Sequence, residues 1–316
     1  MLQTLREHRA ARFLPAALAF PALFFLSLLP TAGAHGQAAR QSRAYLGEPL
    51  PGNTPVPFAP RIITQELHSS PVFSPAGDEV YWGEMEDGIF GMVLVDGEWS
   101  PRTEASFNIP HSGEPVFSVE GDALYFASQH SHSGSQGQWD EDVWKVVRTD
   151  EGWSAPEPLG PMVNDHPMHW GVSLAANGNL YFGRTGGSGD IYVAEFRGGA
   201  YQEAKPLGPG VNSEHGEGTP HVAPDESYLV FSRNAPEGID IFVSYRNDAG
   251  GWSEAEALTA VNTPDGETCP RVSPDGAYLF FLRRPDRDWK PYWVSATVIT
   301  DLAPHRSARP KERTGG

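Results

Sequence analysis

The chain has 316 residues and carries 40 acidic side chains against 23 lysines and arginines, so its formal net charge at pH 7 is −17. Nucleic acid and anionic membrane surfaces are therefore poor partners for its body. Cys269 is the only cysteine, which excludes a disulfide within the chain and leaves a hydrophobic core as the source of stability.

The first residues predict a secretory signal peptide. Arginines precede an apolar run from Phe13 to Leu29, and Ala32-Gly33-Ala34 provides the small residues that a signal peptidase accepts. We therefore expect residues 1–34 to be removed and the mature protein to be periplasmic or extracellular. An uncleaved membrane anchor is the alternative, but the run is short for a span and contains Pro15 and Pro21. Cleavage leaves 20 basic against 39 acidic residues, a net charge of −19.

After the signal peptide, a short unit recurs five times along the chain. Its copies occupy Pro71–Trp82, Pro115–Phe126, Val172–Phe182, Pro220–Phe231 and Pro270–Phe281. The aligned centres of these copies are Tyr81, Tyr125, Tyr181, Val230 and Phe280, with spacings of 44, 56, 49 and 50 residues. In each copy an apolar run ends in a Pro-Asp-Gly-like turn and a second β-rich run follows. This pattern predicts a β-hairpin in each repeat.

Two further β-rich stretches complete most repeats. The third stretch is exemplified by Asp190-Ile-Tyr-Val193 and Asp240-Ile-Phe-Val243, and the fourth by Ala204-Lys-Pro-Leu207. Four strands in each repeat are typical of a β-propeller blade, and no segment after the signal peptide has a helical period. The sequence therefore predicts an all-β protein with a single β-propeller.

The last repeat lacks a fourth strand of its own, because Tyr292–Thr300 is followed by Pro304 and a polar tail. Pro57–Ile63 resembles the fourth-strand stretches, so we expect it to pair with the last blade and to close the ring. This gives five blades. Six blades are the alternative, which requires the N-terminal segment to form more than one strand. We expect an extended N-terminal segment at 35–55, the propeller at 56–302 and a disordered basic tail at 303–316.

The repeats carry a family resemblance. Ser273-Pro-Asp-Gly-Ala-Tyr-Leu-Phe-Phe281 and Gly189-Asp-Ile-Tyr-Val193 resemble the WD40-like (PD40) repeat of TolB and related exported proteins, over about Leu46 to Thr300. The resemblance implies a propeller fold. It does not imply one activity, because such repeats occur in binding proteins, in assembly factors and in the non-catalytic domain of some peptidases.

Basic side chains recur at one position of the repeat, three residues after the aligned centres. The residues at this position are Glu84, Ser128, Arg184, Arg233 and Arg283. In a propeller these residues share one end of the central channel with the loops that lead into the innermost strands. Three arginines there could bind a carboxylate, phosphate or sulfate. Alternatively, each arginine pairs with an aspartate of its own blade, such as Asp190 or Asp240, as a repeated structural tie.

Histidines and glutamates gather before and within the predicted innermost strands. We expect ligand binding by Arg184, Arg233, Arg283, Arg271, His68, His111, His215 and His221, and the candidate catalytic residues are Glu114, Glu217, Glu267 and His169. Imidazole and carboxylate groups could bind a transition metal or act as acid and base, or they could form a solvated polar funnel. No fixed metal-ligand spacing is present, so we expect no cofactor, with a metal ion in the channel as the alternative.

These residues support two functional hypotheses. The first is an exported, monomeric binding module that takes a small anionic molecule, a glycan or a protein segment at the mouth of the channel. The second is a glycan hydrolase or lyase at the same mouth, which would need two carboxylates facing each other at the distances typical of glycosidases. Trp139, Trp170 and Trp289 do not follow the repeat and are candidates for stacking on a sugar or peptide.

Overall fold

The computed structural model describes residues 45–130, 141–165, 169–184 and 189–303. The expected signal peptide, the first part of the N-terminal segment and all but the first residue of the basic tail lie outside these ranges. None of the helices in the described ranges is long and apolar enough to cross a membrane.

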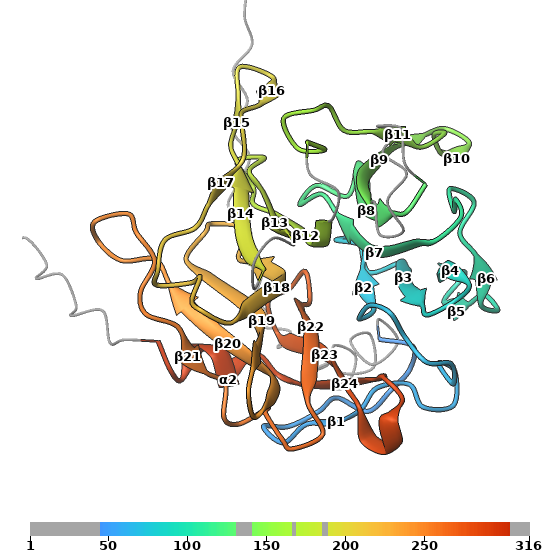
Figure 1. The fold of residues 1–316 in the computed structure, drawn as a ribbon. Helices are drawn as coiled ribbons and strands as arrows, with labels where there is room; N and C mark the ends of the chain where they lie inside the picture. The colour runs from blue at the N-terminus through green and yellow to red at the C-terminus, as the bar shows by residue number, and fades with distance from the viewer. Residues whose placement is uncertain (1–44, 131–140, 166–168, 185–188, 304–316) are drawn as a thin grey trace, which may run out of the picture.

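Five of the six antiparallel sheets that the described strands form are arranged around a central axis (Figure 1). Blade 1 contains β2 (Val72–Phe73), β3 (Glu79–Glu84), β4 (Gly88–Val95) and β6 (Thr103–Glu104). Blade 2 contains β7 (Ser112–Phe117), β8 (Ala123–Ser128), β9 (Asp142–Thr149) and β11 (Glu157–Pro158). Blade 3 contains β12 (His169–Leu174), β13 (Leu180–Arg184), β14 (Asp190–Ala194) and β17 (Lys205–Pro206).

Blade 4 contains β18 (Gly216–Val222), β19 (Tyr228–Ala235), β20 (Gly238–Tyr245) and β21 (Glu256–Ala257). Blade 5 contains β22 (Glu267–Val272), β23 (Tyr278–Arg283), β24 (Lys290–Ser295) and the N-terminal β1 (Val56–Pro57). The inner strands β2, β7, β12, β18 and β22 surround the axis in Figure 1. The expected five-bladed β-propeller is confirmed.

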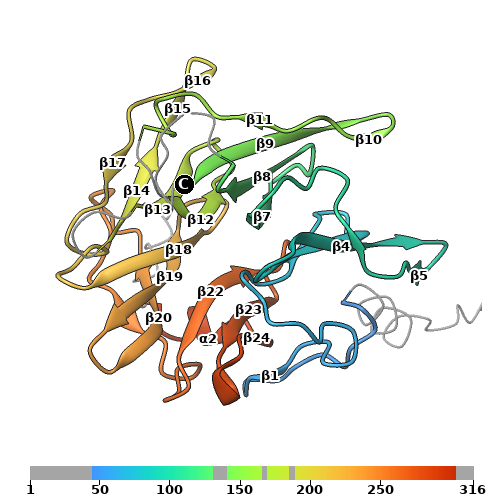
Figure 2. The same ribbon diagram turned by 45° about the vertical axis from the view of Figure 1, so that its right-hand side comes forward.

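Short elements decorate the ring. Figure 2 shows that the ends of β4 and β9 project outward with β5 (Glu98–Trp99) and β10 (Gly152–Trp153), and the hairpin of β15 (Phe196–Arg197) and β16 (Ala200–Tyr201) projects from blade 3. A 3₁₀ turn, η1 (Pro285–Arg287), joins β23 to β24. Beyond β24, Thr297–Thr300 forms the short helix α2, whose Val298 and Ile299 pack into the core beside blades 4 and 5.

The N-terminal strand closes the ring as expected. Val56 and Pro57 of β1 pair antiparallel with Trp293 and Tyr292 of β24, and the amide of Phe58 donates to the carbonyl of Pro291 at 2.8 Å. A proline fits in β1 because this strand is the outer edge of its blade, where one side of the backbone needs no partner. Without β1, the last blade would expose an edge that invites pairing with another chain.

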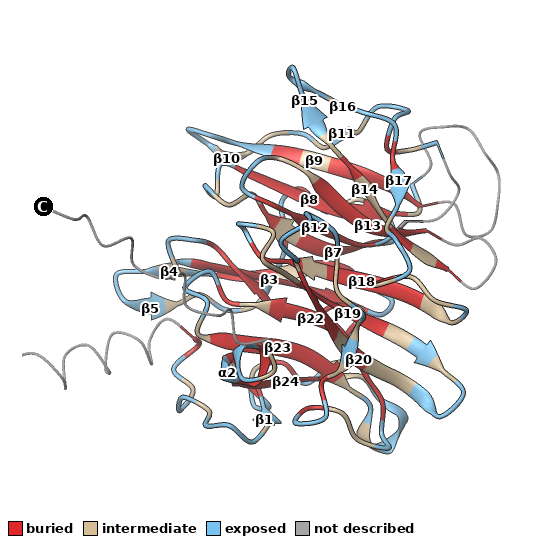
Figure 3. Cartoon of the chain, turned by 90° about the vertical axis from the view of Figure 1, so that its left-hand side faces the viewer, coloured by how far each residue is buried: buried red, intermediate tan, exposed pale blue. Residues whose placement is uncertain are grey.

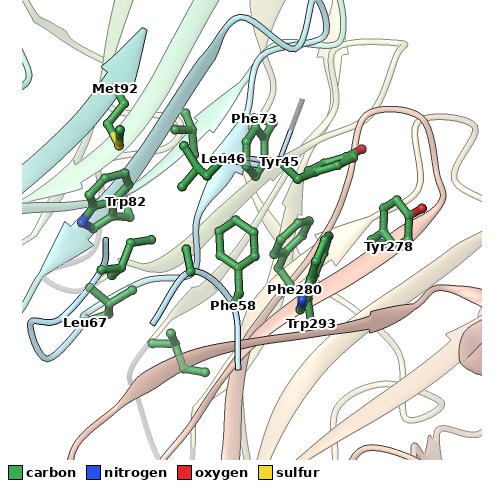
Figure 4. Close-up of a cluster of buried hydrophobic side chains, with 14 of the residues drawn as sticks. Tyr45, Leu46, Phe58, Leu67, Phe73, Trp82, Met92, Tyr278, Phe280 and Trp293 are labelled. Carbon is green, nitrogen blue, oxygen red and sulfur yellow. The ribbon is translucent and has the colours of Figure 1, made fainter. Parts of the chain in front are cut away.

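The hydrophobic core is divided among the five interfaces between neighbouring blades. Figure 3 shows buried residues along the strands and exposed residues in the projecting hairpins. At the interface of blades 5 and 1, the fully buried Phe58 ring packs 5.0 Å from Phe280 and 5.1 Å from Trp293, between centroids (Figure 4). Tyr45 covers the same cluster and packs 5.0 Å from Phe73. The N-terminal segment therefore joins the first and last blades through side chains as well as through β1.

Asparagines that the sequence analysis did not single out fix the loops between blades. Asn164, Asn212 and Asn262 each accept a hydrogen bond through Oδ1, at 2.9 Å, from an amide of the third strand of the preceding blade. Each also donates through Nδ2 to the carbonyl of the same strand residue. These bonds satisfy backbone groups that would otherwise be buried without partners.

Replacing Phe58 with alanine should weaken ring closure. We expect the F58A variant to lose about 3–5 kcal/mol of unfolding free energy, because a large aromatic side chain leaves a cavity at the interface of blades 5 and 1. Chemical denaturation measures this loss. The matched control is F196A on the projecting hairpin, where the side chain is 40 % exposed and the loss should be below about 1 kcal/mol. Equal losses in the two variants would contradict the closing role of Phe58.

Candidate functional site

Strand pairing brings one residue of every inner strand opposite the aligned centre of its repeat. The five pairs are Val72 with Tyr81, Val116 with Tyr125, Ser173 with Tyr181, His221 with Val230, and Arg271 with Phe280. All five inner-strand residues line one cavity of about 440 Å³. We call Val72, Val116, Ser173, His221 and Arg271 the channel ring.

The walls of this cavity are mostly apolar. They include Phe73, Phe117, Leu174, Val222 and Val272 beside the channel ring. The hairpin turns between first and second strands form the rim, with Pro75, Val119, Pro224 and Pro274. Since the rim prolines are exposed, the cavity opens at the end of the propeller that carries the hairpin turns, which we call the turn face. The sequence pattern predicted the site at the opposite end, the loop face, where loops lead into the inner strands.

Arg271 is the charged member of the channel ring and is only 3 % exposed. Its Nη1 donates to the carbonyls of Pro220 and Pro270, both at 2.9 Å, which holds the guanidinium in place. No carboxylate of the described residues forms an ion pair with Arg271. Burial lowers the pKa of Arg271, and the nearby Glu114 carboxylate acts in the opposite direction. A guanidinium remains charged at any physiological pH, so this cavity contains a buried positive charge.

His221 lies beside Arg271 in the channel ring. Its Nδ1 is buried and has no hydrogen-bond partner among the described residues. Burial and the positive charge of Arg271 lower the pKa of His221 to about 3, so its imidazole is neutral at physiological pH. A neutral imidazole offers one donor and one acceptor, and one of its two nitrogens is available to a group in the cavity.

A second layer of inner-strand residues lies below the channel ring. Glu114, Gly171, Thr219 and Cys269 have left-handed backbone with φ of 55°, 62°, 45° and 53°, each within a register shift between first and second strand. We call these four residues the bulge layer. Left-handed φ is uncommon for residues other than glycine and is enriched at functional sites.

The bulge layer is tightly packed across blades. The Gly171 amide donates to a carboxylate oxygen of Glu114, and the Cys269 amide donates to Oγ1 of Thr219 at 3.3 Å. A Cβ on Gly171 would lie 2.4 Å from the Thr219 Cα, so only glycine fits there. Burial raises the pKa of the Cys269 thiol to about 12, which keeps it protonated and unreactive. The bulge layer therefore lies beneath the residues that line the cavity, outside the lining itself, and we call it the floor.

Acidic groups with altered titration lie in and beside this floor. Burial raises the pKa of Glu114 to about 7, although the charge of Arg271 and the Gly171 amide oppose the shift. Burial, and then the charge of Glu114, raise the pKa of Glu141 to about 7. Burial lowers the pKa of His68, against the attraction of Glu141. Glu114 and Glu141 therefore change charge near neutral pH.

The three aligned arginines lie on the loop face, away from the cavity. Arg233 donates through Nε to Glu217 at 2.7 Å, and Arg283 donates through Nε to Glu267 at 2.6 Å. Each also donates through Nη2 to a valine carbonyl in the preceding loop, at 2.9 Å and 2.7 Å respectively. Arg184 pairs with Asp165 and reaches the Val163 carbonyl at 3.3 Å.

These contacts match the structural-tie interpretation, with different partners from the expected Asp190 and Asp240. In blade 1 the acidic residue takes the aligned position and the arginine lies in the loop. Glu84 accepts hydrogen bonds from both Nε and Nη2 of Arg102. In blade 2, Ser128 donates to the Pro110 carbonyl at 2.9 Å. The aligned position thus joins the second strand to a neighbouring loop in every blade.

Two candidate catalytic carboxylates are occupied by these ties. Glu217 also accepts the amide and hydroxyl of Ser213, at 3.1 Å and 2.6 Å. Glu267 accepts the corresponding groups of Thr263, at 2.7 Å and 2.6 Å. Glu114, Glu217 and Glu267 are absent from the lining of the cavity, so the described structure does not bring them together across it.

The remaining predicted residues lie apart from the cavity. His111 is exposed, His215 and His68 are half-buried, and His169 is the first residue of β12, with its side chain outside the described part. Trp170 is 42 % exposed, whereas Trp139 lies outside the described residues. Within the described ranges, no group of three or more His, Cys, Asp or Glu side chains is arranged to hold a metal ion.

Of the predicted residues, the structure places His221 and Arg271 together in the cavity. Sequence analysis missed Ser173 and the apolar walls at the turn face. A pattern in the repeat could have located the site, because His221 and Arg271 replace the valine found at the same position in Pro71-Val-Phe-Ser74 and Pro115-Val-Phe-Ser118. A polar residue in place of a repeated valine indicates a position that is not needed for packing alone.

The loop-face ties should contribute stability. Replacing Arg283 with methionine leaves the Glu267 carboxylate, which is fully buried, without its counter-charge, so we expect a loss of about 3 kcal/mol in the free energy of unfolding. In the R197M control the side chains of the ion pair with Glu195 are 69 % and 37 % exposed, and the loss should be below about 1 kcal/mol. Denaturant titration compares the two variants, and a similar small loss in both would argue against a structural tie.

The raised pKa of Glu114 predicts a pH-dependent stability. Its ordinary value is 4.5 and its folded value is about 7, so the folded state holds this proton more tightly and stability falls as pH rises between them. The E114Q variant has no such proton. We expect its stability relative to the parent protein to increase by up to about 3 kcal/mol between pH 5 and pH 8. Thermal denaturation across this range, with exposed E120Q as control, tests the trend, and a constant difference would contradict it.

The chain matches no protein-family model and no curated protein sequence. Its fold is similar to that of a protein from Agrobacterium tumefaciens assigned as TolB, with a TM-score of 0.50 and 17 % identity over 69 % of this chain and 70 % of that chain. The catalytic domain of an α-L-arabinofuranosidase from Coprinopsis cinerea gives 0.48 and 14 % over 78 % and 94 %. A gluconolactonase from Xanthomonas campestris gives 0.44 and 15 % over 71 % and 69 %. At these identities the likeness concerns the fold, and the chain has the β-propeller fold that the TolB-type repeats predicted.

Proposed function

We propose that this protein is an exported binding module that holds an anionic organic ligand in the cavity at the turn face. Arg271 and His221 would bind the anionic group, and the apolar walls would cover the rest of the ligand. The signal-peptide pattern and the TolB-type repeats support a periplasmic or extracellular location, and we propose that the protein acts there as a monomer.

The observation that carries this proposal is the state of Arg271. A buried guanidinium is costly unless it is paired with an anion or fully hydrogen-bonded. The Arg271 guanidinium is fixed through Nη1, and no carboxylate of the described residues pairs with it. His221 adds a buried Nδ1 without a partner at the same place. A ligand carboxylate could satisfy both groups at once, because it accepts several hydrogen bonds.

The cavity also limits the kind of anion. A volume of about 440 Å³ lies within the range of small-molecule sites. Valine, leucine, phenylalanine and proline outnumber the polar lining residues, so the walls suit an apolar body better than the many hydroxyls of a glycan. The polar lining residues besides Arg271 and His221 are Ser118, Ser173, Tyr228, Ser273 and Asp275. The terminal carboxylate of a protein segment would present the same chemistry as a small organic acid. Of the ligand classes expected from the sequence, we therefore propose the small organic anion.

No specific contact favours the alternative of a glycan hydrolase or lyase. Such an enzyme needs two carboxylates on either side of a substrate. Among the described residues, Glu217 and Glu267 are bound to arginines on the loop face, and Glu114 lies in the floor below the channel ring.

The proposal is tested with a panel of apolar monocarboxylates, namely 2-naphthoate, 4-phenylbutyrate and octanoate. We expect at least one to bind the protein at pH 6, and the R271M variant to bind it about 10- to 100-fold more weakly, because a charged hydrogen-bond donor is lost. Isothermal titration calorimetry measures the affinities.

The matched control is R284M, which removes an exposed arginine on the loop face. This variant should bind like the parent protein. Equal affinities for R271M and the parent, or failure of the whole panel to bind the parent protein, would contradict the proposed function.

A further inference from the structure

Glu114 is the acidic group whose charge acts on Arg271. It belongs to the bulge layer directly below the channel ring, is 4 % exposed, and accepts the amide of Gly171. The charge of Arg271 is the largest influence that favours the ionised form of Glu114. No ion pair or hydrogen bond joins the two side chains, so Glu114 acts on Arg271 through its charge alone. The guanidinium thus keeps its hydrogen-bonding capacity for a ligand while Glu114 controls the net charge beneath it.

The other titratable groups around Glu114 come from two strands and two loops. Glu141 precedes β9, His68 lies in the loop before β2, Cys269 belongs to β22 and His221 belongs to β18. Because burial lowers the pKa of His221 and raises that of Cys269, the imidazole is neutral and the thiol is protonated near pH 7. Arg271 and Glu114 therefore set the charge beneath the cavity, while the exposed Asp275 lies at its rim. Glu141, whose pKa the charge of Glu114 raises, is the second acid that could hold a proton.

We propose that Glu114 determines the charge of the ligand that this cavity accepts, by taking up one proton when a monoanionic organic acid binds to Arg271. The inference rests on the proposed function. With Glu114 ionised, Arg271 and Glu114 already cancel, so a bound monoanion would leave an uncompensated negative charge in an apolar site. With Glu114 protonated, the ligand and Arg271 cancel. The proton comes from solvent and stays on a Glu114 carboxylate oxygen, and no covalent bond to the ligand forms or breaks.

This arrangement selects a class of ligand. A neutral analogue leaves Arg271 unpaired, and a dianion exceeds the one positive charge of the floor. The cavity should therefore prefer a monocarboxylate with an apolar body to both the corresponding amide and the corresponding dicarboxylate. Inorganic phosphate, which is largely divalent above pH 7 and has no apolar body, should bind weakly.

The pH dependence follows from the state of Glu114 in the free protein. Its folded pKa of about 7 means that Glu114 is protonated below that pH and ionised above it. Binding of an anion raises this pKa further, because a second negative charge disfavours ionisation. Affinity for a monocarboxylate should therefore be constant below about pH 6 and should fall by about tenfold for each pH unit above 7.

The experiment measures binding of the tightest-binding member of the carboxylate panel by calorimetry between pH 5.5 and 8.5, in buffers with different ionisation enthalpies. The buffer dependence gives the number of protons taken up, and we expect about one proton per ligand at pH 8. The E114Q variant keeps a carbonyl acceptor for the Gly171 amide but carries no charge. This variant should bind the carboxylate without proton uptake, and its affinity at pH 8 should equal that of the parent protein at pH 6.

The matched control is E141Q, which removes the neighbouring acid and should keep the loss of affinity at high pH. If E141Q abolishes the pH dependence and E114Q retains it, the proton resides on the wrong residue and the inference is wrong. Binding that depends on Arg271 but not on pH, or equal affinity for mono- and dicarboxylate, would also overturn it while leaving the proposed function intact. If no carboxylate of the panel binds the parent protein at pH 5.5 and none binds E114Q at pH 8, both proposals are contradicted.

Discussion

Closure of the ring is the constraint on which the rest of the structure depends. Five inner strands can line a common axis only if each blade packs on two neighbours, and the last interface is completed by an N-terminal strand that pairs with β24. The aromatic cluster of Phe58, Phe73, Phe280 and Trp293 fills that interface. Around the channel, Gly171 of blade 3 approaches Thr219 of the neighbouring blade 4 so closely that no side chain fits between them. The floor is therefore built from contacts between neighbouring blades of the ring.

Buried charge is handled in two different ways at the two ends of the channel. At the loop face, Arg233 and Arg283 each have a glutamate of the same blade and a backbone carbonyl as partners, so their charge is compensated within the protein. At the cavity, Arg271 has backbone carbonyls as hydrogen-bond partners and the partly protonated Glu114 nearby, with which it forms no ion pair. An arginine with a complete set of partners stabilises the fold, whereas an arginine without a bound counter-charge can form its ion pair with a ligand.

Variation among the blades is concentrated where it can affect the channel. The hairpins, asparagine contacts and core aromatics recur, because each blade packs against two neighbouring blades in the same way. The channel ring differs from blade to blade, with two valines, a serine, a histidine and an arginine at equivalent positions. Repeats thus provide a common frame, and the departures from the repeat provide one polar side and one apolar side around a single cavity.

The sequence by itself determined the five blades, their hairpins and the N-terminal closing strand, because alternation of apolar residues, turn residues and repeat spacing are local properties. It also placed His221 and Arg271 among the candidates. Only the tertiary structure decided which arginines are neutralised, since Arg184, Arg233 and Arg283 look equivalent to Arg271 as ligand-binding candidates until their partners are known. The sequence likewise could not decide which end of the channel is open. Bulges at Glu114, Thr219 and Cys269 close the floor through contacts between neighbouring blades, and these contacts join residues 50 and 57 positions apart in the chain.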